Sequence, residues 1–237
     1  MRGLHGCLAA TAAILLALSA CSDSTKPPQD RPVMINGTVL DAEGAPVAGA
    51  SILLQHAFEA APGDVGAKPQ TQIEFVITEP DTVDIWITSP CTGDTVRVIQ
   101  PQCPLYTGEY RLFWRGVDRE ERPVGDGVYR LNLVGRHADV HADFVFARDD
   151  WATLATGDPV AALATTGDDG AFTIDTACLP FGYEFGGVDE SGTPTGRTAI
   201  SRSVRLWAVI PGHGVISSDW VVVDAEDGAE VVIAPGS

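Results

Sequence analysis

Residues 33–54 of this 237-residue chain read VMINGTVLDAEGAPVAGASILL, and this stretch decides the fold class. Apolar residues occupy every second position from Val33 to Val39, apart from Gly37, which is the period of a β-strand with one buried face. Residues 41–46 then supply turn-forming Asp, Gly and Pro, and a second apolar run ends at Leu54. The stretch therefore predicts two strands joined by a tight turn.

The same two-residue alternation recurs along the chain. It is seen at residues 83–87, 110–114, 129–133, 204–210 and 220–222, with Asp-Gly or Glu-Gly pairs at 43–44, 126–127, 169–170 and 227–228. Short alternating runs separated by such turn pairs are typical of antiparallel β-sandwiches. No convincing amphipathic helix is present, although residues 150–164 could hold a helical turn or two. We expect an all-β protein with antiparallel sheets.

Residues 35–54 resemble the opening of carboxypeptidase regulatory-like domains, which are small transthyretin-like (prealbumin-like) sandwiches. The next element of that family, T-x-x-D-G-x-F-x-I, occurs only at Thr166–Ile174, and a P-G-H turn follows at residues 211–213. Members of this family are non-catalytic accessory modules, so the resemblance implies the same for this chain.

The intervening sequence WRGVDREERPVGDGVY, residues 114–129, resembles the signature of FlgD-type immunoglobulin-like domains. Two positions depart from that signature, Arg115 and Glu121, and the turn between the strands is expected to differ locally. The matching residues, for which a structural role is expected, are Trp114, Gly116, Asp118, Pro123, Val124, Gly127, Val128 and Tyr129.

The two resemblances predict an Ig-like sandwich at residues 70–148 inside a transthyretin-like sandwich made of residues 33–55 and 160–237. The connectors would be residues 56–69 and 149–160. Insertion at an exposed strand connection is well tolerated when the termini of the guest lie close together. A serial order of modules is the alternative. Nesting is favoured because the first block alone has too few strands to bury a core.

Residues 1–20 have the basic start, apolar middle and small final residues of an export signal, and the apolar run is too short for a stable membrane span. The sequence Leu18-Ser19-Ala20-Cys21 resembles the lipobox of bacterial lipoproteins. That resemblance implies cleavage before Cys21 and palmitate-type acylation of this cysteine, which would anchor the chain to a membrane. An ordinary signal peptide with an incidental cysteine is the alternative.

Residues 22–32 are polar and rich in proline, as expected of an extended tether after the lipidated Cys21. Ser22 rather than Asp follows the cysteine, and this resembles the sorting pattern of outer-membrane lipoproteins more than that of inner-membrane ones. We expect an exported protein anchored in the bacterial cell envelope.

Three cysteines remain in the folded part: Cys91, Cys103 and Cys178. The first two flank a turn-rich stretch between two strand-like segments, so a local Cys91–Cys103 disulfide is predicted and Cys178 is the odd thiol. No C-x₂-C spacing indicates zinc, and no Ca²⁺-loop motif is present. No metal and no cofactor are expected.

The formal net charge of −17 argues against nucleic acid as a partner. No nucleophile elbow and no recognisable catalytic triad occur, so we expect a non-enzymatic protein that presents binding or scaffolding surfaces to an envelope protein or glycan. A carbohydrate-binding accessory module is the alternative, because aromatic residues in loop-like segments could stack on sugars: Trp151, Phe181, Tyr183 and Phe185. A role in flagellar hook assembly rests on the FlgD resemblance alone, and the export signal opposes it.

Overall fold

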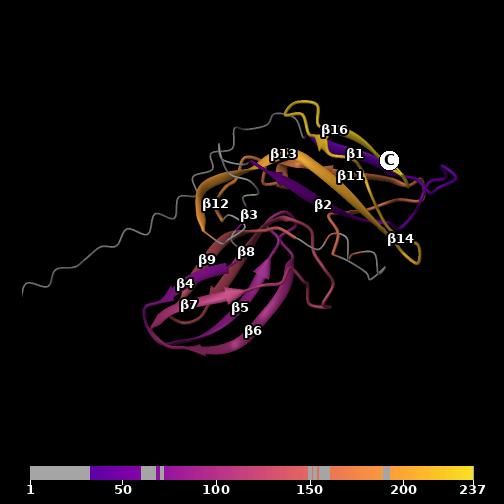
Figure 1. The fold of residues 1–237 in the computed structure, drawn as a ribbon. Coiled ribbons are helices and arrows are strands. Elements are labelled where there is room, and N and C mark those ends of the chain that lie inside the picture. The colour runs from indigo at the N-terminus through magenta and orange to yellow at the C-terminus, as the bar shows by residue number, and fades with distance from the viewer. Residues whose placement is uncertain are drawn as a thin grey trace, which may run out of the picture.

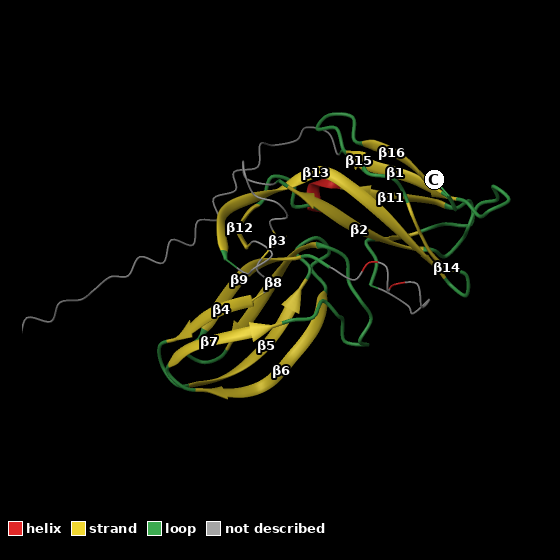
Figure 2. Cartoon of the chain, viewed as in Figure 1, coloured by secondary structure: helices red, strands yellow, loops and turns green. Residues whose placement is uncertain are grey.

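A computed structural model describes residues 33–59, 68–69, 72–148, 151, 154, 161–188 and 193–236. The predicted signal peptide, Cys21 and most of the predicted connectors lie outside these residues. The described part is all-β, as predicted, and contains no α-helix (Figure 2). A single turn of 3₁₀-helix, η2 (Thr176–Cys178), interrupts the strands of the second half.

The outer sandwich, so named because its strands come from both ends of the described chain, has two sheets. The first has the order β11-β1-β16, and the second has the order β10-β2-β13-β12-β3, with β14 and β15 also paired to β13. These strands are β1 (Met34–Val39), β2 (Ser51–Phe58), β3 (Lys68–Pro69), β10 (Ala164–Thr165), β11 (Ala171–Asp175), β12 (Glu184–Val188), β13 (Pro194–Ile210), β14 (Gly214–Ser217), β15 (Val221–Val222) and β16 (Ala229–Ile233).

One strand pair departs from the expected antiparallel arrangement. The strands β1 and β16 run parallel, with Ile35 opposite Ala229 and Val39 opposite Ile233, whereas β1 and β11 are antiparallel. The first and last described strands of the sandwich therefore lie side by side (Figure 1).

The inner sandwich is formed by strands from the middle of the chain. A two-stranded sheet pairs β4 (Gln72–Ile77) with β7 (Gly108–Phe113). A four-stranded sheet has the order β6-β5-β8-β9, with β5 (Asp81–Thr88), β6 (Thr95–Leu105), β8 (Gly127–Val134) and β9 (Asp139–Phe146). Figure 1 shows these strands as a separate layered body below the outer sandwich.

Each sandwich has its own apolar core. In the outer one, Ile35, Val39, Ile52 and Leu206 are fully buried. Gly37 of β1 lies under the Phe172 ring, and a Cβ at this position would come within 2.2 Å of the ring. In the inner core, Trp114 contacts the rings of three aromatic residues, namely Tyr129, Phe144 and Phe146. The alternation seen in the sequence thus places one face of each strand in a core.

Candidate functional site at the junction of the two sandwiches

The carboxylate of Asp126 ties the two sandwiches together. One oxygen accepts a hydrogen bond from the backbone N–H of His56, at the end of β2 in the outer sandwich (3.1 Å). The other accepts one from the backbone N–H of Arg148, just after β9 (2.6 Å). The Asp126 N–H itself donates to the Leu54 carbonyl (3.1 Å). Because Asp126 is buried, these bonds are shielded from water and fix β2 against the start of β8.

An apolar cluster lies on the same junction. Val145 of the inner sandwich packs with Phe185 and Ile200 of the outer sandwich, and all three are buried. Phe58 meets the Phe185 ring edge-on, with ring centroids 5.4 Å apart. Burial of apolar surface between two bodies stabilises one relative arrangement. The two sandwiches are therefore packed on each other as well as connected in sequence.

A disulfide between Cys91 and Cys178 also joins the sandwiches, with the two Cα atoms 4.5 Å apart. Cys91 lies in the connection between β5 and β6, and Cys178 lies in η2 of the outer sandwich. The predicted Cys91–Cys103 pairing is wrong, and Cys103 is the free cysteine among the described residues.

The reason for this error is the length of β6. The predicted turn-rich stretch between Cys91 and Cys103 is largely strand, and Cys103 pairs in register with Val83 near the start of β5. Cys91 follows Thr88 at the opposite end of β5. Five strand residues span roughly 17 Å, whereas a disulfide requires Cα atoms within about 7 Å. A bond between the two ends of this hairpin is therefore excluded.

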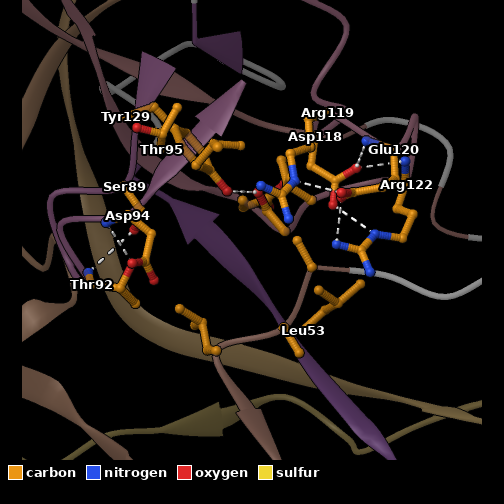
Figure 3. A pocket seen from close by; sticks show the side chains of 17 residues that line it. Leu53, Ser89, Thr92, Asp94, Thr95, Asp118, Arg119, Glu120, Arg122 and Tyr129 are labelled. Atoms are coloured by element: carbon orange, nitrogen blue, oxygen red, sulfur yellow. Dashed lines mark hydrogen bonds and ion pairs between the residues drawn. The ribbon is translucent and has the colours of Figure 1, made fainter. Parts of the chain in front are cut away.

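A pocket of about 470 Å³ opens at the junction (Figure 3). Ser89, Thr92 and Asp94, from the connection that holds Cys91, form one wall. The facing wall is formed by Asp118, Arg119, Glu120 and Arg122. Leu53 of β2 lies at its base, together with apolar residues 161–163. The pocket thus combines polar walls with an apolar base, and its lining is more polar than that of most small-molecule sites.

The facing wall is held by the buried carboxylate of Asp118. This carboxylate accepts hydrogen bonds from the backbone N–H groups of Glu120 and Arg122, both at 2.9 Å. It also accepts one from Nε of Arg122 at 2.7 Å, and the same guanidinium pairs with Glu120 at 2.8 Å. The charges on this wall are therefore largely satisfied by one another.

The other residues of the predicted Ig-like signature have structural roles. The Trp114 indole donates to the Val117 carbonyl at 2.9 Å, and the buried Tyr129 hydroxyl donates to the Gly125 carbonyl at 2.8 Å. Burial raises the pKa of Tyr129, with the negative charge of Asp126 adding to the effect. Gly116 has φ +66° beneath the Phe146 ring. The rest contribute to the turn and the core around it: Val117 bridges Pro123, Val124 is buried, and Gly127 and Val128 begin β8.

His56 is a buried titratable side chain next to this junction, and its Nδ1 has no hydrogen-bond partner. Its ring meets Phe181 edge-on at 5.8 Å, and the Arg202 guanidinium covers the Phe181 ring at 4.8 Å. Burial lowers the pKa of His56 from 6.5 to about 3. The imidazole is therefore neutral at physiological pH.

The predicted stacking aromatics do not form one exposed platform. Trp151 is buried and stacks on Trp207, with ring centroids 5.2 Å apart, and Phe185 is buried in the junction cluster. Phe181 is half-buried beneath Arg202, and the half-buried Tyr183 lines a separate small pocket beside Phe185. The prediction of stacking is therefore wrong for Trp151 and Phe185, because their rings are enclosed by neighbouring strands.

Sequence reasoning missed Asp126 and His56, whose hydrogen bond connects the two sandwiches. The Asp126-Gly127 pair predicts only a turn, and His56 falls within a predicted connector. The one available signal was that β2 continues apolar through Ala57 and Phe58.

Within the described ranges, no group of three metal-ligating side chains gathers, and no helix has the length and apolar character needed to cross a membrane. A disulfide is typical of proteins outside the reducing cytoplasm, so the Cys91–Cys178 bond indicates an extracytoplasmic location. No protein-family model, curated protein or solved structure matches the chain.

Proposed function

We propose that this chain is a non-enzymatic protein, anchored by lipid on Cys21 outside the cytoplasm, that presents its two sandwiches as one binding or scaffolding surface. The observation that carries the proposal is the junction. Hydrogen bonds to Asp126, the apolar cluster around Phe185 and the Cys91–Cys178 disulfide all hold the sandwiches in one relation. Because these three kinds of contact hold the two sandwiches in place before binding, they suit a preformed surface that recognises a partner.

The use of the junction carboxylates supports a non-enzymatic role. Asp118 accepts three hydrogen bonds, and Asp126 accepts two from backbone N–H groups. Both carboxylates are thereby committed to hydrogen bonds that maintain the structure of the junction. The location of the pocket between two accessory-type sandwiches makes its rim the preferred contact region for an envelope partner.

The rim can be tested by photo-crosslinking of the full chain in cells, with a photoreactive residue in place of Asp94. A partner should be crosslinked from Asp94 but not from Glu230, which lies on a sheet that contributes nothing to the pocket. Crosslinking should weaken in a Cys91→Ser/Cys178→Ser background. Without the disulfide, the β5–β6 connection that carries Asp94 is no longer held against the outer sandwich. Substrate turnover by the purified chain, abolished by one carboxylate substitution, would refute the proposal.

The lipid anchor has its own test. Mass spectrometry of the amino-terminal peptide should find acylated Cys21 as the first residue of the membrane-bound protein. The Cys21→Ser variant should lose the lipid and leave the membrane fraction. An unmodified Cys21 in membrane-bound protein would contradict the anchor while leaving the junction proposal intact.

A further inference from the structure

The strand β7 has one edge without a strand partner among the described residues, since β7 pairs only with β4. The β4–β7 ladder is regular over its whole length, from Gln72 opposite Phe113 to Ile77 opposite Gly108. Between Gly108 and Phe113 the strand has no proline and no bulge, which are the usual features that block edge-to-edge pairing. Within the described part of the chain, the edge of β7 is therefore open to another strand.

The side chains on this edge are complementary to themselves. Glu109 and Arg111 are both exposed and point to the same face, with Tyr110 between them on the opposite face. If β7 pairs antiparallel with a second β7 about Tyr110, Glu109 of each copy lies opposite Arg111 of the other. Both cross-strand pairs are then attractive, and a twofold axis relates them.

The same register accounts for one exposed aromatic side chain. Phe113, at the end of β7, is 70% exposed. Pairing about Tyr110 places Phe113 opposite Thr107 of the second copy, on the face that carries Glu109 and Arg111. Phe113 would thereby be partly covered at each end of the interface.

We propose that two copies of this chain associate through β7, in an antiparallel register centred on Tyr110. The two-stranded sheets of the two copies then become one continuous four-stranded sheet with the order β4-β7-β7-β4. A two-stranded sheet has a marginal number of strands, and pairing brings it into the usual range. The junction pocket, to which neither β4 nor β7 contributes, stays open in this dimer.

Disulfide trapping of the full chain in cells tests both the contact and its register. In a Thr107→Cys/Phe113→Cys variant, the cysteine at position 107 of one copy faces the cysteine at position 113 of the other. The two positions lie roughly 20 Å apart along one strand, so they cannot bond within a chain. A reductant-sensitive dimer on a non-reducing gel is expected. Each single variant, Thr107→Cys or Phe113→Cys, should give no dimer above the wild type.

Charge reversal on the trapping background tests the complementarity. Glu109→Arg should lower the yield of dimer on the order of tenfold, because Arg then faces Arg at both symmetric positions. Arg111 also pairs with Glu74 of β4 at 3.2 Å, so the rescue adds Arg111→Glu together with Glu74→Arg. This combination restores opposite charges across the interface and within the β4–β7 ladder, and it should restore the yield. All three positions are exposed, so these substitutions leave the core unchanged.

Two results would overturn the proposal. The first is no dimer from the double-cysteine variant, as expected if β7 stays unpaired or receives a strand of another protein. The second is equal dimer from the double and single variants, which would show contact without this register. A failure to rescue by Arg111→Glu together with Glu74→Arg would likewise refute the charge pairing.

Discussion

At the scale of a single residue, the buried His56 makes stability depend on pH. The folded chain holds this imidazole neutral with a pKa of about 3, whereas the unfolded chain takes up a proton near its ordinary value of 6.5. Protonation therefore favours unfolding, and the stability contributed by the neutral state is complete above pH 6.5. It is lost as the pH falls from 6.5 towards 3, at about 1.4 kcal/mol per pH unit.

This dependence predicts a difference between variants. Between pH 7 and pH 4.5, the His56→Leu variant should lose about 2.5 kcal/mol less of its free energy of unfolding than the wild type. Urea denaturation at the two pH values measures the difference, because titrating carboxylates common to both proteins cancel. His213→Leu, at an exposed position, should follow the wild type. Equal losses in the His56→Leu variant and the wild type would show that His56 is protonated in the fold.

Asp126 carries a second prediction at this scale. Substitution by Ala leaves the N–H groups of His56 and Arg148 without their carboxylate partner in a buried junction, and should lower the free energy of unfolding by about 3 kcal/mol. Denaturant titration provides the measurement. The matched control is Glu184→Ala, which removes an exposed pair with Arg197 and should change stability by less than about 1 kcal/mol. If Asp126→Ala and Glu184→Ala lowered the free energy of unfolding by similar amounts, Asp126 would not stabilise the junction.

At the scale of an element, the turn before β8 depends on Gly116. Its φ is +66°, and a Cβ there would lie 1.9 Å from the Phe146 ring. Gly116→Ala should therefore be destabilising by roughly 3 kcal/mol, from the backbone conformation and the overlap with the ring together.

Gly44→Ala is the matched control, because Gly44 also has positive φ, at +81°, but a Cβ there meets open space. It should lose only the backbone contribution, roughly 1 kcal/mol. Thermal or urea unfolding compares the two variants. If both lose the same amount, the close packing of Phe146 on Gly116 is not maintained.

At the scale of the whole molecule, the Cys91–Cys178 bond should stabilise the assembly of both sandwiches. It closes a loop with a sequence separation of 87 residues, and its removal by Cys91→Ser/Cys178→Ser should lower the free energy of unfolding by about 4 kcal/mol. Cys103→Ser, which removes a free thiol, should change it by less than about 1 kcal/mol. A non-reduced peptide map should contain the 91–178 linkage, and a 91–103 linkage there would contradict the structure.

Part of the inner core could be predicted from the sequence because its signature residues are close along the chain. Trp114 and Tyr129 belong to one short segment, and their aromatic and turn chemistry predicts local packing. The strand pattern was predictable for the same reason, since alternation is a property of neighbouring residues.

The sequence by itself determined the all-β class, because apolar alternation and Asp-Gly turns are local signals. Only the tertiary structure decided which strands share a sheet, that Cys91 bonds to Cys178, and that Asp126 joins β2 to β8. These contacts connect residues 70 or more positions apart, and their partners depend on how the two sandwiches pack. A local sequence pattern does not depend on that packing. The contact between Asp126 in a turn and His56 in a connector could therefore not be predicted from it.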